Sequence, residues 1–416
     1  GGPTRRAARI LFIFPGQGSQ CPRMGEGLYR GEPIYRRHVD RMCEALVPLL
    51  TFDLRARLYP NAPDDDDASP AYLREFNGPL VTQPAIFVSE LALGYTLLEL
   101  GVRPDGIAGH SIGEFVAATL AGIFTEMDAL NIIATRARLS ELAAPEGRML
   151  AVNAAEPIAA AVVAVDPERL WLAVLNSRGR QVIAGETCAV ERAAATLAAR
   201  GVKSRLLPVN RAYHTPLMRG VQAALAQLLS RMQLHAPSVP LCCNGTGGWM
   251  ESAVATNAVY WAAHVASAVR WVDNMDALAM RAPATVVELG SGSSLAPLLA
   301  ECTAEGAEHL RSLTTLRHPK EAFSDGDADQ EVFAEALGAL WLNGMALEWR
   351  AYHMGERYTK LPLPAYSFEP TTHWVNDSAS MYVPSMAEAL EVAQSAVDAE
   401  HSATTEVAAA AEAAAA

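Results

Sequence analysis

Residues 109–113 read GHSIG, and their setting constrains the fold more than any other feature of this sequence. The stretch 105–110 is short and Gly-rich and is predicted to be a strand, whereas 112–121 has a helical pattern that ends at Gly122. The two glycines of the motif permit a sharp turn and a close approach of two backbone segments. A strand that turns directly into a helix is typical of α/β domains.

The serine in this turn, Ser111, is placed to act as a nucleophile. GxSxG between a strand and a helix is the pattern of a nucleophile elbow. Free main-chain N–H groups at the start of the helix favour a developing negative charge, and the N–H of Ile112 can point into an oxyanion hole. A tight turn with a capping serine and no chemistry would give the same five residues, because small residues recur by chance.

A serine hydroxyl needs a base, and His214 has the most suggestive setting of the ten histidines. It follows a predicted strand, 204–209, and precedes a proline that would begin a helix. This would place it at the carboxyl end of a strand, where the sites of α/β proteins form. His110 is predicted to point away from the serine, and His264 reads as a core residue or a support of the site. The pairing predicts an acyl-transfer enzyme that carries its acyl group as an ester on Ser111.

The remaining pattern indicates more than one structural unit. Residues 10–14, ILFIF, read as a buried strand. Between about 147 and 212, strand-like runs alternate with Ala-rich helices, which suggests a small inserted α+β subdomain. From 376 onwards the composition is of low complexity and predicts a linker or a disordered tail with some helical content. Helices are predicted over 83–100, 112–121, 128–142, 154–164, 188–200 and 331–341.

Composition disfavours several classes of protein. Half of the 416 residues are hydrophobic and 19% are charged, as in soluble globular proteins. The net charge of −13 argues against a nucleic-acid binder, and neither a signal peptide nor an apolar run of about 18 residues is evident. The six cysteines form no CxxC pair, which favours free thiols in a reducing cytoplasm over a zinc or redox site: Cys21, Cys43, Cys188, Cys242, Cys243 and Cys302.

Two further patterns resemble ligand-binding motifs but are incomplete. Residues 16–18 and 290–292 each follow a predicted strand, yet both lack the third glycine of a dinucleotide-binding turn. Residues 325–329 read DGDAD, but Gln330 stands where a calcium loop needs glycine and Ala336 where it needs glutamate. A nucleotide-binding protein is therefore a minor alternative, and 325–329 are interpreted as an acidic loop.

Four sequence blocks in this order resemble the malonyl-CoA:acyl carrier protein transacylase family. They read FPGQGSQ, GHSIGE, YHTPLM and VELGSG, and begin at residues 14, 109, 213 and 287. The resemblance is nearest to the acyltransferase domains of type I modular polyketide synthases. The run 361–375, LPLPAYSFEPTTHWV, is similar to the linker that follows those domains. The resemblance covers roughly residues 9–376, and four ordered blocks are far more specific than GxSxG alone.

The resemblance implies an α/β fold, with an α/β-hydrolase-like large subdomain and an inserted ferredoxin-like small subdomain. The acyl site would lie in the cleft between them, and the chain would be a piece of a longer multidomain protein. The implied segments are a linker remnant at 1–8, the large subdomain at 9–146 and 213–316, the small subdomain at 147–212, a post-acyltransferase linker at 317–376 that wraps back over the core, and a low-complexity tail at 377–416.

The resemblance also assigns roles to individual residues. Ser111 would be the nucleophile and His214 the general base, and the main-chain N–H groups of Gln17 and Ile112 would form the oxyanion hole. The histidine would be oriented by a main-chain carbonyl, which the local pattern places near Ser267, and not by a carboxylate. This agrees with the lack of an obvious acid in triad order.

Other residues bear on the choice of substrate. The resemblance implies that Arg136 clamps the free carboxylate of a dicarboxylic acyl group, for which a guanidinium offers two parallel donors; the alternative is a surface arginine that pairs with a nearby acid. Gln83 lies in a TQPA block that the family places near the site. By the resemblance, the bulky Tyr213 and the presence of Ile112 imply malonyl over methylmalonyl, whereas Arg211 stands where malonyl-selective domains commonly have histidine. One methyl group is worth about 1–3 kcal/mol, so some leakage is expected.

The expected reaction is a ping-pong acyl transfer with no permanently bound cofactor and no metal. Malonyl-CoA, or methylmalonyl-CoA or another substituted malonyl-CoA, would acylate Ser111. The phosphopantetheine thiol of an acyl carrier protein would then accept the acyl group. Flanking polyketide synthase domains such as a ketosynthase would be further partners, but nucleic acid and membrane would not. A thioesterase or hydrolase on the same elbow is the main alternative, and a silent docking domain is another.

Overall fold

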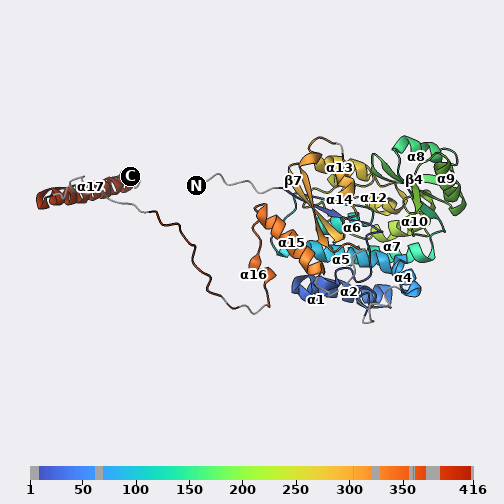
Figure 1. The fold of residues 1–416 in the computed structure, drawn as a ribbon, viewed down its shortest axis with the longest axis horizontal. Coiled ribbons are helices and arrows are strands. Elements are labelled where there is room, and N and C mark those ends of the chain that lie inside the picture. The colour runs from blue at the N-terminus through green and yellow to red at the C-terminus, as the bar shows by residue number, and fades with distance from the viewer. Residues whose placement is uncertain are drawn as a thin grey trace. The chain divides into compact units, whose positions relative to one another are not determined.

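The computed structural model describes residues 9–60, 69–302, 304–319, 328–355, 359, 361–371 and 385–413. The chain divides into two units, Gly1–Glu356 and Arg357–Ala416, each described here by itself. In the first unit, helices surround a larger sheet, and a smaller sheet lies beside it with its own helices (Figure 1). The prediction for residues 1–8 lies outside the described residues.

The larger sheet is parallel and is built on β1 (Arg9–Phe14), the apolar run that the sequence predicts as a buried strand. β1 pairs with β2 (Gly106–Gly109) on one side and with β7 (Ala284–Ser291) on the other, and β8 (Leu310–Leu316) extends the sheet beyond β7. Every residue of β7 is buried. Such continuous burial is the mark of a central parallel strand with helices on both faces.

The core helix of the large subdomain is α5 (Pro79–Glu99). It begins earlier than the predicted residue 83, because Pro79 occupies the first helical turn, where proline is favoured. α2 (Pro33–Leu50) and α7 (Glu126–Leu142) pack on it. α5 is long and apolar enough to cross a membrane, but 89% of its most apolar window is buried inside the protein. This burial identifies α5 as a core helix.

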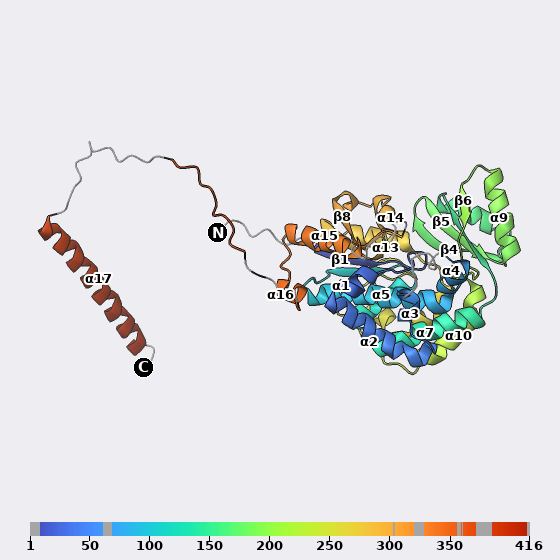
Figure 2. The same cartoon turned by 60° about the horizontal axis from the view of Figure 1, so that its bottom comes forward.

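The smaller sheet has its own connectivity, shown beside the larger one in Figure 2. Its strands are antiparallel in the order β4-β5-β3-β6, and a separate apolar core lies beneath them. The order strand, helix, strand, strand, helix, strand is ferredoxin-like, and this confirms the expected fold class. The elements are β3 (Arg148–Val152), α8 (Glu156–Val163), β4 (Leu170–Ser177), β5 (Arg180–Gly185), α9 (Thr187–Ala199) and β6 (Ser204–Leu206).

The predicted strand 204–209 is too long. β6 pairs with β3 only as far as Leu206, and Pro208 follows, which has no N–H to donate to a ladder. The chain then returns to the large subdomain through helical segments, several of them short. These are η1 (Pro216–Met218), α10 (Arg219–Leu229), α11 (Ser252–Ala255), α12 (Ala258–Ala263), η2 (His264–Ala266), α13 (Trp271–Ala279), α14 (Ala296–Ala300) and η3 (Ala307–His309).

The last helices of the first unit are α15 (Ala328–Leu342) and α16 (Trp349–Tyr352). α15 contacts β8 and α1 (Glu26–Gly31), and Phe333 and Leu337 are buried at this contact. Residues 325–327 of the acidic stretch lie outside the described residues. Asp329 belongs to α15, and its carboxylate accepts the main-chain N–H groups of Gly27 and Arg317, at 3.3 and 3.2 Å. The remaining short helices near the N-terminus are α3 (Arg55–Leu58) and α4 (Pro70–Phe76).

The second unit contains one helix within its described residues, α17 (Met386–Ala413). Its Ala-rich composition agrees with the helical content that the sequence predicts for the tail. Residues 361–371 have no regular secondary structure, and their side chains are exposed. The bounds of the subdomains and linkers stay predictions.

Candidate active site

Ser111 lies in the turn between β2 and α6 (Gly113–Leu120), as the sequence predicts. The backbone there is strained, because Ser111 has φ 54°, in the left-handed region that non-glycine residues rarely adopt. Both glycines of the motif are required by close packing. A Cβ on Gly109 would lie 2.0 Å from the carbonyl oxygen of Gly113, and one on Gly113 would lie 2.3 Å from the carbonyl oxygen of Phe14.

Ser111 and His214 are brought into direct contact, with Oγ 2.7 Å from Nε2. The other ring nitrogen of His214, Nδ1, lies 3.0 Å from the carbonyl oxygen of Ser267 and 3.2 Å from that of His264. Carbonyl oxygens can only accept hydrogen bonds, so Nδ1 carries the proton and Nε2 is free to accept the hydroxyl proton of Ser111. The pair therefore has the arrangement of a nucleophile and its base.

Electrostatics keep His214 neutral. Burial lowers the pKa of His214 well below its usual value, and the neighbouring His264, Arg136 and His110 lower it further. The imidazole is therefore unprotonated at neutral pH, as a general base must be.

The prediction that His214 lies at the carboxyl end of a strand is wrong. β6 ends at Leu206 and belongs to the smaller sheet. His214 lies instead in a turn with φ 63°, and its main-chain N–H donates to the carbonyl of Val265 at 2.8 Å. Contact with the segment 264–267 therefore positions both the backbone and the ring of the histidine.

Arg136 lies on α7 and is 0% exposed, which excludes the alternative of a surface arginine. Its Nη1 donates to Oε1 of Gln83 at 2.6 Å, while Nε and Nη2 have no hydrogen-bond partner. Burial lowers the pKa of Arg136 to about 10, so the guanidinium stays charged at neutral pH. A buried cation with two open donors is suited to a carboxylate that arrives with a substrate.

Gln83 and Tyr213 lie beside this arginine. The ring of Tyr213 is 5.6 Å from the guanidinium carbon of Arg136, and its hydroxyl accepts a hydrogen bond from Gln83 Nε2 at 3.3 Å. Gln83 Nε2 also lies 3.5 Å from Oε1 of Gln17. Thus Gln83 and Tyr213, which are far apart in the sequence, both contact one buried cation, and Gln17 contacts Gln83.

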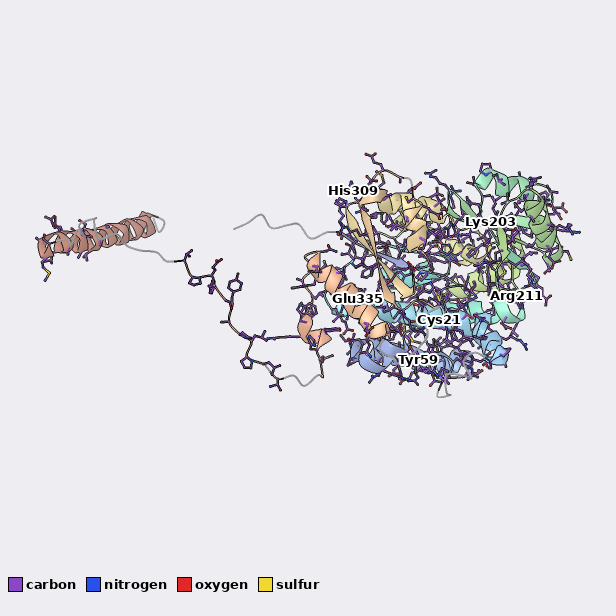
Figure 3. All side chains as sticks on the ribbon, viewed as in Figure 1. Cys21, Tyr59, Lys203, Arg211, His309 and Glu335 are labelled. Carbon is purple, nitrogen blue, oxygen red and sulfur yellow. The ribbon has the colours of Figure 1, made fainter. Side chains whose placement is uncertain are left out.

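Arg211 is not part of this group. Its guanidinium donates to the carbonyls of Ser140 and Glu141, at 2.9 and 2.8 Å, near the end of α7. Unbonded carbonyls at a helix C-terminus are favourable partners for a cation, so these contacts anchor the segment before His214 to the helix that carries Arg136. Figure 3 shows Arg211 at the α7 side of the small subdomain.

A cleft of about 560 Å³ lies between the two subdomains. Gln17 and His110 contribute to its wall next to Ser111, although Ser111 and His214 are not themselves in the lining. His110 turns away from the nucleophile, and its Nε2 lies 2.8 Å from Oδ1 of Asn176 on β4. The small subdomain adds cationic side chains to the opposite wall, among them Lys203 (Figure 3).

Sequence analysis missed two buried polar residues behind the elbow, Glu114 and Asn244. Asn244 bonds directly to the backbone of the elbow. Glu114 receives the hydroxyl of Tyr260, and its Oε2 lies 3.1 Å from Nε2 of His264. Burial raises the pKa of Glu114 and lowers that of His264, so it favours the neutral form of each group. The sequence does contain a signal for Glu114, because it is an acidic residue within the otherwise apolar helix 113–120.

The family described as the acyl transferase domain matches residues 11–332. A phenolphthiocerol/phthiocerol polyketide synthase protein of Mycobacterium tuberculosis is 30% identical over 374 residues, which cover 90% of this chain. They cover only 24% of that protein, so this chain spans about a quarter of the relative's length.

Two solved structures are similar along most of the chain. The acyltransferase domain from the second module of the salinomycin polyketide synthase has a TM-score of 0.75 and 36% identity, and the match covers 87% of this chain and 80% of that one. A malonyl-CoA:acyl carrier protein transacylase from Xanthomonas oryzae has a TM-score of 0.67 and 28% identity, covering 80% of this chain and 98% of that one.

Proposed function

The chain belongs to the acyl transferase domain family and is an acyltransferase, and on this premise we propose that it loads malonyl from malonyl-CoA onto the phosphopantetheine thiol of an acyl carrier protein. One observation carries the choice of substrate: the buried guanidinium of Arg136 has two open donors and is close enough to His214 for its charge to lower the pKa of that histidine. The similar transacylase from Xanthomonas oryzae is named for the same acyl donor and acceptor.

In the first half of the reaction, Ser111 Oγ attacks the thioester carbonyl while His214 Nε2 takes the hydroxyl proton. The main-chain N–H groups of Ile112 and Gln17 stabilise the oxyanion, that of Ile112 from the start of α6. The carbon–sulfur bond then breaks, and CoA leaves as a thiol with the proton from His214. The product is a malonyl ester of Ser111.

In the second half, the phosphopantetheine thiol of the carrier attacks this ester, and His214 takes the thiol proton. The ester bond to Oγ breaks, and the proton returns to Ser111. The CoA is a substrate and the phosphopantetheine belongs to the carrier, so neither is a resident cofactor. A hydrolase would use water at this step. The cationic clamp supports a transferase that keeps a charged extender unit on the serine until the carrier arrives.

Recognition of malonyl follows from the surroundings of Arg136. Its bond to Gln83 fixes the guanidinium, so that Nε and Nη2 present two donors to the free carboxylate. An acetyl group would leave this buried charge without a partner, which disfavours it. Tyr213 fills space next to Arg136 and disfavours a methyl branch on the substrate. One extra methylene in a pocket changes kcat/KM by about 10–200-fold, and we expect a preference for malonyl in this range. Methylmalonyl-CoA or another substituted malonyl-CoA is the alternative substrate.

The cleft supports the approach of two phosphorylated molecules. Lys203 and Arg205 lie in its small-subdomain wall and are exposed. Such side chains can pair with the phosphates of CoA and of the phosphopantetheine arm. A cytoplasmic location and flanking synthase domains such as a ketosynthase are parts of the same proposal. The flanking domains are supported by the relatives that this chain matches over a fraction of their length.

The proposal is tested by intact-protein mass after brief incubation with malonyl-CoA, methylmalonyl-CoA or acetyl-CoA. We expect a malonyl adduct, little methylmalonyl adduct and almost no acetyl adduct, and no adduct on Ser111→Ala. Addition of a holo carrier protein should remove the malonyl adduct and add the same mass to the carrier. A dominant methylmalonyl adduct would overturn the choice of malonyl. Loss of the adduct to water with no gain by any carrier would favour a hydrolase.

A further inference from the structure

Asn244 is 1% exposed, and three of its four polar groups are bonded to the segments around Ser111. Its Oδ1 accepts the main-chain N–H of Ser111 at 2.9 Å, and its Nδ2 donates to the carbonyl of Gly109 at 2.6 Å. Its main-chain N–H lies 3.2 Å from Oε2 of Glu114, and its carbonyl accepts the N–H of Arg270 at 2.9 Å. Each nitrogen and oxygen of this residue is therefore already engaged within the protein.

The side-chain amide bridges the two backbone groups that flank the strained turn. Ser111 at φ 54° is a conformation that costs about 1–3 kcal/mol and persists only where its surroundings impose it. Bonds to the carbonyl of Gly109 and the N–H of Ser111 fix the backbone that leads into this dihedral angle. They also occupy the N–H of Ser111, so the next N–H, that of Ile112, is the one that remains for an oxyanion.

Asn244 is also connected to the support of the base. The N–H of Arg270 donates to the carbonyl of Asn244, and Arg270 lies three residues after Ser267. The carbonyl of Ser267 accepts the Nδ1 proton of His214 at 3.0 Å. One residue therefore joins the turn that carries the nucleophile to the loop that orients the base.

Glu114 and His264 make a second link between the same two segments. Glu114 is in α6, directly after the elbow, and its Oε2 lies 3.1 Å from His264 Nε2 and 3.2 Å from the N–H of Asn244. The carbonyl of His264 is the other acceptor near Nδ1 of His214, at 3.2 Å. Asn244, Glu114 and His264 thus form a continuous polar network beneath the Ser111–His214 pair.

We propose that Asn244 is the positioning residue that holds Ser111 Oγ and His214 Nε2 at the separation needed for proton transfer, and so sets the rate of Ser111 acylation without contacting the substrate. This inference rests on the proposed acyl transfer for its natural substrate. It also predicts the reactivity of Ser111 towards small electrophiles, which can be measured without the natural substrate.

The test compares wild-type protein with Asn244→Leu, which keeps the size of the side chain and removes both hydrogen bonds. We expect the rate constant for acylation by malonyl-CoA to fall by about 100-fold, since a displacement near 1 Å has such an effect on a reaction that depends on orientation. KM should stay within about twofold, because no substrate contact is lost. Labelling of Ser111 by a small fluorophosphonate should slow by a similar factor.

Thr315→Val is the matched control. Thr315 is fully buried, and its hydroxyl donates to the carbonyl of Glu288 at 2.9 Å and accepts the N–H of Gly290 at 3.3 Å. Like Asn244→Leu, this substitution removes one side-chain bond to a main-chain carbonyl and one from a main-chain N–H, but the two main-chain groups are in β7 and not in the elbow. We expect a similar decrease in Tm, with both acylation and fluorophosphonate labelling within about threefold of wild type.

The proposal is overturned if Asn244→Leu reacts within threefold of wild type, if Thr315→Val slows as much, or if the defect is in KM alone. If Asn244→Leu does not fold, Asn244→Asp decides, since it keeps an acceptor for Ser111 and loses the donor to Gly109. It should slow at least tenfold with KM unchanged, and a rate within threefold rejects the role. Wild-type protein that reacts with fluorophosphonate but not with malonyl-CoA would reject the proposed substrate, while the labelling rates still test Asn244.

Discussion

At the scale of single residues, the open donors of Arg136 are the feature that a substrate can satisfy. The guanidinium is fully buried, and only Nη1 has a partner, Gln83. A buried charge of this kind is unfavourable unless a counter-ion pairs with it. Binding of a substrate that lacks a carboxylate leaves the charge unpaired and is therefore disfavoured. The lowered pKa of His214 adds a second constraint, because it sets the pH below which the base is protonated.

Arg136→Ala should lower kcat/KM for malonyl-CoA by at least about 100-fold, because it removes two charge-assisted hydrogen bonds of about 1.5–3 kcal/mol each, and every 1.4 kcal/mol is a factor of ten. The value for acetyl-CoA should stay within about threefold or rise. Initial acylation rates with both thioesters give the ratio. Arg138→Ala is the control, since Arg138 is exposed on the same helix and donates to the carbonyl of Leu49. Equal losses with both thioesters would contradict the clamp.

The rate of acylation should depend on pH through His214. Its pKa is lowered, mainly by burial, so the basic form prevails at neutral pH and is lost only in acid. The single-turnover rate with malonyl-CoA should therefore be level from about pH 8 down to about pH 6.5, the ordinary histidine pKa, and should fall with a midpoint below it. Mass spectrometry of quenched samples gives the profile. A midpoint at or above the ordinary value would show that the imidazole is not desolvated.

The reacting residues can be located from the sequence because they lie in local motifs, but their partners cannot. The contact of Arg136 with Gln83 spans 53 positions, and that of Asn244 with Ser111 spans 133. No periodicity or turn pattern encodes such distances. Ser267 follows from the resemblance, and its carbonyl does face Nδ1 of His214. The chemical roles of all these residues stay proposals.

At the scale of elements, the junction of β2 with α6 is held by the close approach of backbone segments. Gly113 packs against the carbonyls of Phe14 and Pro15, at the end of β1. Local pattern predicted this junction correctly, since glycine, strand and helix signals lie within 20 residues of one another. It failed for 204–209, where Pro208 ends the ladder, and for the start of α5, where Pro79 begins the helix.

Gly113→Ala should destabilise the protein by about 1–3 kcal/mol or more, as overpacking does, because its Cβ would lie 2.3 Å from the carbonyl oxygen of Phe14. Gly338→Ala is the control, since a Cβ there meets nothing within 4 Å in α15. It should stabilise by about 0.5–1 kcal/mol, the usual gain over glycine in a helix. Urea unfolding measures both. A neutral Gly113→Ala would mean that the elbow can relax.

At the scale of the whole molecule, the first unit holds every residue of the candidate site, from Gln17 to Ser267, and α15 completes its core. Phe333, Leu337 and Leu340 of α15 are buried against the first unit, whereas the described side chains of α17 are exposed. The sequence predicted a helix at 331–341 from periodicity, and for the residues from 376 onwards only a linker or disordered tail with some helical content. It could not say which of them contributes to the core, because burial depends on the neighbours that the fold supplies.

Two truncations should therefore behave differently. Removal of residues 385–416 takes away α17 and no buried side chain that the structure describes, so Tm and the rate of malonyl-CoA acylation should match the full chain. Removal from residue 328 onwards uncovers β8 and loses the buried apolar side chains of α15, each worth about 1.5–3 kcal/mol. That chain should unfold at a much lower temperature or fail to fold. Equal stability of the two would show that α15 is dispensable, whereas loss of acylation in the shorter deletion, with Tm unchanged, would assign α17 a part in the reaction.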